Sequence, residues 1–325
     1  MSATTLTVVL GLSAAVIWGA GDFSGGMSAR RLPVLPVIAI AHGFSMVCLL
    51  GLVWFFHQPA PTGMPFAWGV IAGVANGCAL LAFYRALSLG NMGVTAALSG
   101  LLTAALPVLF SLMTIGAPLP RQQVGLVLAA VAIWLIGSQP KANPNNASLQ
   151  QQRHQRQQWI LSMVAGVGFG IFLITMKLAN PSGLLWPLVT GKIGSLSIVL
   201  PGLLFVTVFH RRRSRPESHD AGHTYDAGHA RDDETRAPLP AKQAMSSNLR
   251  LGMMLALLAG IFDTSGNFLF VLATRVGRLD IAAVLSSLYP ASTILLAAWL
   301  LHERASKRQT LGMASAVLAV VLIVR

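Results

Sequence analysis

Acidic side chains are scarce in this chain, and so are charges of either sign. Aspartate and glutamate together number 10 in 325 residues, charged residues make up 10%, and hydrophobic residues make up 54%. Such a chain is too apolar to fold as one soluble globule. Cysteine is rare too: Cys48 and Cys78 both lie in apolar stretches, which fits packing thiols better than a disulfide framework. A membrane is therefore the expected solvent.

Apolar stretches of span length follow one another along the sequence. A helix needs about 20 residues to cross a hydrocarbon core of about 30 Å. No stretch alternates as barrel strands do, so we predict an all-α membrane protein with ten transmembrane helices. No basic stretch precedes the first apolar run, which is therefore expected to be a span and not a cleaved signal. The predicted spans are residues 6–27, 34–56, 65–88, 93–116, 122–139, 158–178, 184–209, 250–274, 279–301 and 308–324.

The chain also contains an internal repeat. Residues 259–324 align without a gap on residues 72–137 at a constant offset of 187, and the front of each half aligns at an offset of 151. Five spans per half force the two copies to insert in opposite directions, which predicts two inverted five-helix repeats. The superposed pairs include Gly19 with Gly170, Asn76 with Asp263, Gly90 with Gly277, and Gly125 with Gly312.

The repeat divides the chain into two domains. These are residues 1–139 and residues 158–325, joined by a linker at 140–157 that is rich in Asn and Gln. Residues 210–248 form a charged insert in the second domain with almost no large apolar residue, so disorder is predicted there. His219, His223 and His229 lie near carboxylates in this insert, but a low-complexity solvated loop is the favoured interpretation. No metal site and no cofactor are predicted.

Basic residues give the chain a net charge of +13. They lie in short clusters between the spans, with no stacking platform or binding motif beside them, so we interpret them as topology signals and predict no nucleic-acid partner. Their distribution over the loops favours both termini on the outer side.

Ionisable residues inside spans are the first candidates for function, because each costs at least about 2.5 kcal/mol in the bilayer. Asp263 lies near the middle of its span and aligns with Asn76, and Asn267 follows one turn later on the same face. Lys192 and His42 are the other titratable groups at depth. Asp263 and Lys192 either belong to a substrate site or form an ion pair that only locks helices together.

The remaining candidates also have purely structural interpretations. Asp22, close to the end of the first span, is either a site residue or an interfacial polar group, and a lone histidine such as His42 is more often a packing residue. Prolines interrupt two predicted spans at Pro107 and Pro290, where kinks would suit a gate. The aromatic residues predicted to wall a cavity are Trp18, Tyr84, Trp186 and Tyr289.

Three segments carry a family resemblance. Ala14 to Gly19 reads AAVIWG, Tyr84 to Gly90 reads YRALSLG, and Leu301 to Ser306 reads LHERAS. With the ten-span layout and the repeat, the chain resembles EamA-type members of the drug/metabolite transporter superfamily. The glutamate that usually follows the fourth helix of each half is present as Glu303, whereas the matching position of the first half is Gly116.

The resemblance implies a basket of ten helices, with a central cavity lined by the first four helices of each half and with the fifth helices outside. It also implies a transporter, not an enzyme, that moves amino acids or other small metabolites, often outward, across a bacterial cytoplasmic (inner) membrane. Both termini would then be cytoplasmic, opposite to the charge distribution, so the orientation stays open.

We therefore predict a secondary transporter that exports a small amphipathic metabolite by alternating access, with proton coupling through Asp263 as a hypothesis. An amino acid, a nucleoside and an aromatic amine fit the candidate residues equally. One alternative is an intramembrane aspartyl protease, because residues 19–22 read GAGD and Asp263 could be the second acid; the order of its motifs opposes this. Another is a membrane ligand sensor. Partners other than substrate, protons and lipid are not predicted.

Overall fold

The computed structural model describes residues 2–89, 92–137, 149–213, 239–300 and 306–324, and the regular structure in these residues is helical. This confirms the predicted all-helical class. The first half contains α1 (Ala3–Ala29), α2 (Val34–Phe55), α3 (Met64–Leu89), α4 (Met92–Thr114) and α5 (Pro120–Gly137). The second half contains α6 (Leu149–Ala179), the short 3-10 helix η2 (Asn180–Ser182), α7 (Trp186–Arg213), α8 (Leu239–Val276), α9 (Leu279–Ser286), α10 (Tyr289–Leu300) and α11 (Lys307–Val324).

Within the described residues, eight helical stretches are long and apolar enough to cross a membrane, and α5 contributes a shorter apolar helix. Large apolar side chains point outward from several of them: Trp54 is 79% exposed, Met113 85% and Trp299 75%. Side chains of this kind on the outside of a helical bundle are expected where the surroundings are lipid and not water.

The predicted span at 279–301 is two helices in the structure. α9 ends at Ser286 and α10 begins at Tyr289, with a turn between them. Pro290 lacks an N–H group, so the carbonyl of Ser286 loses its helical donor, and the ring crowds the preceding turn. Pro107, by contrast, lies inside α4 without ending it.

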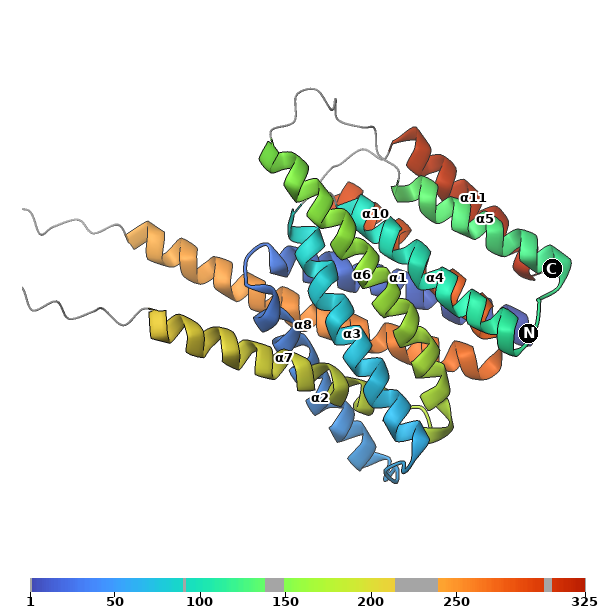
Figure 1. Ribbon diagram of the computed structural model, residues 1–325, viewed down its shortest axis with the longest axis horizontal. Coiled ribbons are helices and arrows are strands. Elements are labelled where there is room, and N and C mark those ends of the chain that lie inside the picture. Colours follow the sequence, from blue (N-terminus) through green and yellow to red (C-terminus); the bar gives the residue numbers. More distant parts are fainter. Residues whose placement is uncertain (1, 90–91, 138–148, 214–238, 301–305, 325) are drawn as a thin grey trace, which may run out of the picture.

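Helices also extend into the segments predicted to be irregular. α6 begins at Leu149, inside the predicted linker at 140–157, and α7 and α8 reach Arg213 and Leu239, inside the predicted insert at 210–248. Figure 1 shows the ends of α7 and α8 running beyond the rest of the bundle. The predicted loop histidines and Glu303 lie outside the described residues.

Packing between helices mostly joins one half of the chain to the other. α1 runs against α8, α3 runs against α6, α2 packs on α7, and α5 packs on α11 at one edge of the molecule (Figure 1). The repeat relates α1 to α6 and α3 to α8, so the first two contacts are copies of each other. α1 begins and α11 ends at the same end of the bundle (Figure 1).

Two glycines show the same relationship at atomic detail. A Cβ added to Gly125 of α5 would lie 2.7 Å from Cγ1 of Ile323, and a Cβ added to Gly312 of α11 would lie 2.8 Å from Cγ1 of Ile136. The offset of 187 relates Gly125 to Gly312 and Ile136 to Ile323. The two helices therefore contact each other through equivalent residues in both directions.

Arg278, which is partly exposed, pairs with the buried Asp280 at the junction of α8 and α9 and also bonds to the first half. Arg278 donates from Nε to both oxygens of Asp280, at 3.1 and 3.2 Å, and from Nη2 to Oδ2 at 2.7 Å. Nη2 also donates to the carbonyl of Gly116, after α4, at 2.7 Å. Asp280 is fully buried, and this fork gives its side chain charge-assisted hydrogen bonds in place of water.

Lysine keeps the positive charge of Arg278 but cannot make the same set of bonds. We expect Arg278→Lys to destabilise the protein by about 1–2 kcal/mol through the lost charge-assisted hydrogen bonds. Thermal unfolding in detergent measures this loss. The matched control is Arg121→Lys at an exposed position, expected to stay within about 0.5 kcal/mol of the parent. Equal effects of the two substitutions would mean that the fork does not stabilise the junction.

Candidate functional site

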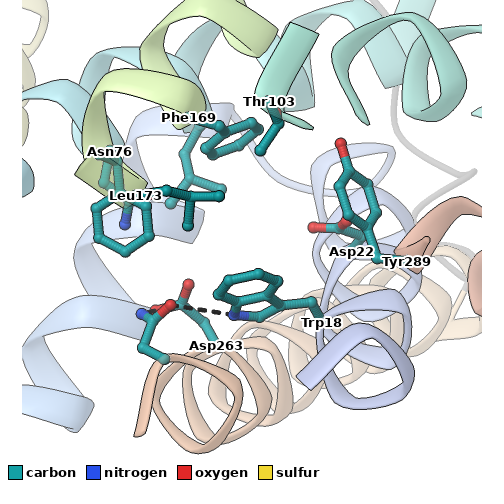
Figure 2. Close-up of a pocket in the computed structure, with 11 residues that line it drawn as sticks. Trp18, Asp22, Asn76, Thr103, Phe169, Leu173, Asp263 and Tyr289 are labelled. Atoms are coloured by element: carbon teal, nitrogen blue, oxygen red, sulfur yellow. Dashed lines mark hydrogen bonds between the residues drawn. The ribbon is translucent and has the colours of Figure 1, made fainter. Parts of the chain in front are cut away.

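A cavity lies between the two halves of the chain (Figure 2). It contains about 390 Å³ of space that no atom fills, part of it open to the outside. Its walls come from α1, α3 and α4 of the first half and from α6, α8 and α10 of the second. The lining residues are Trp18, Asp22, Asn76, Leu80, Thr103, Phe169, Phe172, Leu173, Asp263, Asn267 and Tyr289.

Asp263 of α8 is the most heavily contacted polar group in the cavity wall. Its Oδ2 pairs with Nζ of Lys192 from α7 and accepts a hydrogen bond from Nδ2 of Asn267 at 3.2 Å. Nε2 of His42 from α2 lies 3.6 Å from the same oxygen. Lys192 and His42 are almost completely buried, whereas 18% of the Asp263 side chain is exposed. The carboxylate therefore lines the cavity, with its cation buried out of reach of the cavity.

His42 continues this polar network away from the cavity. Its Nδ1 shares a hydrogen bond of 2.7 Å with Oγ of Ser195 on α7. Nearby, the hydroxyl of Ser45 on α2 donates to the carbonyl of Gly260 on α8 at 2.9 Å. The network thus crosses α2, α7 and α8, and it gives Asp263 two titratable neighbours.

Trp18 of α1 is tied to the same carboxylate through an amide. Its Nε1 donates to Oδ1 of Asn267 at 3.0 Å, and Asn267 in turn donates to Asp263 (Figure 2). The Trp18 ring also packs on Phe270, with 5.8 Å between ring centroids. The hydrogen bond to Asn267 and the packing on Phe270 together fix the indole ring in the cavity wall.

Asp22, one turn after Trp18 on α1, is placed differently. Figure 2 shows Asp22 and Tyr289 on one side of the cavity and Asp263 on the other, with Trp18 between them. Within the described part of the chain, the Asp22 side chain has no hydrogen bond and no ion pair. The hydroxyl of Tyr289 is already bonded to Oγ of Ser99 at 2.7 Å.

Most of the side chains predicted from the sequence meet here. Lys192 and His42 contact the cavity residue Asp263 from outside the wall. Tyr84 does not line the cavity; its ring lies tilted against Phe83, with 6.1 Å between ring centroids, and packs on Gly25 of α1. Trp186 lies elsewhere and donates from Nε1 to the carbonyl of Gln58 at 3.3 Å. The predicted residues that line the cavity are Trp18, Asp22, Asn76, Asp263, Asn267 and Tyr289.

Sequence reasoning missed the apolar members of the wall. Phe169 and Leu173 are the repeat counterparts of Trp18 and Asp22 at the offset of 151, and Leu80 is the counterpart of Asn267 at the offset of 187. Apolar residues in a span give no signal by themselves. The repeat would have identified them, once the polar member of each pair was assigned to the cavity.

These pairs divide the lining into two walls of different character. We call Trp18, Asp22, Asp263 and Asn267, from α1 and α8, the polar wall. We call Leu80, Phe169, Phe172 and Leu173, from α3 and α6, the apolar wall; Asn76 is the polar exception on α3. Each of the three pairs related by the sequence offsets therefore contributes one residue to each wall, and the two residues of each pair differ in chemical character.

The apolar helices, the outward-facing apolar side chains and the amphipathic cavity define an integral membrane protein with several spans. Residues 237–325 match the model of the EamA-like transporter family, which confirms the resemblance predicted from the sequence. A solved structure described as "Crystal structure of protein" is similar over 97% of this chain and 94% of its own, with a TM-score of 0.62. At 14% identity this likeness concerns the fold alone. No curated protein is significantly similar.

Proposed function

We propose that the protein is a secondary transporter that moves a small amphipathic metabolite by alternating access. The observation that carries this proposal is the cavity between the halves, whose two walls are built from residues that the repeat relates. In transporters made of inverted repeats, substrate binds at the interface between repeats and one repeat rocks against the other. The proposal includes the outward direction and the bacterial inner membrane.

The architecture that we propose is ten spans in two inverted repeats of five. α1 to α5 supply the first five, and α6, α7, α8, the α9–α10 stretch and α11 supply the second. The packing of α1 on α8 and of α3 on α6 supports it, as does the reciprocal contact of α5 with α11. An even number of spans also agrees with α1 beginning and α11 ending at the same end of the bundle.

Flux into proteoliposomes tests the function. Purified protein in vesicles is offered a panel of labelled amino acids, nucleosides and aromatic amines, with protein-free vesicles as the control. We expect saturable uptake of at least one of these classes, dependent on the protein. Saturable binding without uptake would make the chain a membrane ligand sensor and would refute transport.

The contacts of the two cavity acids favour transport over proteolysis. An aspartyl protease needs two carboxyl groups that share a proton. Here Asp263 is bound to Lys192 and Asn267, and no hydrogen bond joins Asp22 to Asp263 within the described residues. A carboxylate already neutralised by an ammonium group is poorly suited to act as half of such a dyad.

Proton coupling through Asp263 is the finer part of the proposal, because a proton and Lys192 can compete for the same carboxylate. We expect Asp263→Asn to lose uptake driven by a pH gradient by about 100-fold or more, the lower end of what one proton-transfer group contributes. Substrate exchange without a gradient should persist. The measurement is uptake with and without an imposed gradient, at a temperature at which the variant is still folded, because Asp263→Asn leaves the ammonium group of Lys192 unpaired. Unchanged gradient dependence would remove this role from Asp263.

A further inference from the structure

We propose that the cavity is built for a protonated amine that carries an aromatic or similarly flat apolar group. The ammonium group binds Asp22, and the apolar group lies against the apolar wall. This inference rests on the proposed function, since it names the substrate class of the same site. It is carried by the distribution of charge over the cavity, by the chemistry of the groups around Asp22 and by the contrast between the two walls.

The charges in the cavity select a cation. Asp263 is neutralised by Lys192, whereas Asp22 has no cationic partner within the described part of the chain. An unpaired carboxylate inside a membrane span is costly, and a cationic ligand relieves that cost. None of the residues that line the cavity is basic, and Lys192 is 3% exposed. A ligand carboxylate would therefore meet two acids and no available cation, which disfavours anions and zwitterions.

The groups around Asp22 suit an ammonium ion attached to a flat body. Trp18 and Tyr289 flank Asp22 in the cavity (Figure 2). The indole N–H of Trp18 already donates to Asn267, and the phenol hydroxyl of Tyr289 already shares a hydrogen bond with Ser99. What they offer a ligand is ring surface, which attracts cations and packs on other rings.

The apolar wall fixes the orientation of the ligand. Leu173 occupies in α6 the repeat position that Asp22 occupies in α1, and Leu80 occupies in α3 the position of Asn267 in α8. A ligand turned by the symmetry of the repeat would place its ammonium group against leucine and phenylalanine side chains. The site therefore accepts an amphipathic amine in one orientation.

Three probes with similar carbon skeletons test this class: 2-phenylethylamine, 2-phenylethanol and 3-phenylpropionate. Titration calorimetry with purified protein in detergent measures their binding. We expect the amine to bind at least about tenfold more tightly than the alcohol and the acid, an advantage of about 1.4 kcal/mol. Asp22→Asn should abolish this advantage and leave binding of the alcohol unchanged.

The matched control is Asp280→Asn, which makes the same chemical change at a buried carboxylate that does not line the cavity. Its affinity for the amine should equal that of the parent. Asp22→Glu retains the charge and should keep the preference for the amine. It shows whether a side-chain change at this position preserves the fold, so that a loss in Asp22→Asn can be assigned to the charge. Equal binding of amine and alcohol to the parent protein would overturn the proposal, as would an undiminished amine preference in folded Asp22→Asn.

Flux measurements separate this inference from the function on which it rests. If vesicles move the alcohol or the acid but not the amine, the protein is a transporter and the substrate class is wrong. If the amine binds through Asp22 but is not moved, the ligand class stands and transport is wrong. Uptake of 2-phenylethylamine that is lost in Asp22→Asn and retained in Asp280→Asn supports both.

Discussion

Lys192→Met is expected to destabilise the protein by about 3–5 kcal/mol, the usual cost of removing one partner from a buried ion pair. Lys192 is almost completely buried, and its ammonium group is paired with Asp263. Methionine retains the length and the apolar stem of the side chain, so the loss reports on charge and not on packing. Asn267 still donates to Asp263 in the variant, but a neutral amide cannot balance a carboxylate. Thermal unfolding in detergent provides the measurement.

The double variant Lys192→Met/Asp263→Asn isolates the charge. Removing both charges leaves a neutral site, so most of the stability lost in Lys192→Met should return. Transport driven by a pH gradient should not return, because the exchangeable carboxylate is gone. A double variant as unstable as Lys192→Met would show that the loss comes from packing of α7 against α8 and not from an unpaired acid.

Gly73→Ala is expected to have the other large effect, a loss of at least about 3 kcal/mol, at the upper end of the usual cost of overpacking. A Cβ at Gly73 of α3 would lie 1.9 Å from the carbonyl oxygen of Gly191 on α7. The obstacle is backbone, so no side-chain rotation relieves it, and the two helices must separate. Unfolding by heat measures the stability, and flux measures whether the separated helices still support transport.

Other glycines of the chain provide the comparisons. A Cβ at Gly260 of α8 would lie 2.4 Å from the carbonyl oxygen of Ala41 on α2, so Gly260→Ala should be nearly as damaging as Gly73→Ala. The repeat relates these two positions. Gly43 of α2 has nothing within 4 Å of an added Cβ, and Gly43→Ala should gain up to about 1 kcal/mol of helix propensity. If Gly73→Ala were as harmless as Gly43→Ala, backbone contact would not set the spacing of α3 and α7.

The all-helical fold could be predicted from the sequence because the length of an apolar run is a local property. The break between α9 and α10 was harder, since Pro107 and Pro290 look alike in the sequence but only Pro290 coincides with a helix end. Which of two prolines breaks its helix depends on neighbouring helices that the sequence does not display. The helical ends of the predicted insert and linker were missed because polar residues can extend an apolar helix beyond the membrane.

The polar residues of the candidate site were predictable from the sequence, because burying a polar side chain in a membrane span costs free energy. Asp263, Asp22 and Asn267 stood out because polar groups inside spans need a reason to be there. Trp186 was predicted as a cavity residue from its position at the start of a repeat, but the structure places it against the carbonyl of Gln58. Aromatic side chains are stable in many surroundings, so their position in a span says little about which way they face.

The break between α9 and α10 lies directly before Tyr289 in the cavity wall, and it has no copy in the first half. There Thr103 occupies the position equivalent to Pro290, and its hydroxyl donates to the carbonyl of Ser99 within a continuous helix, at 2.8 Å. In a carrier, a broken helix in one repeat (α9–α10) and a continuous helix in the other (α4) would give the inward-facing and outward-facing states different energies. The proposed carrier would then rest in one of them, and its half-saturation concentrations would differ on the two faces of the membrane. Rectified flow would follow from a single proline in one copy of the repeat.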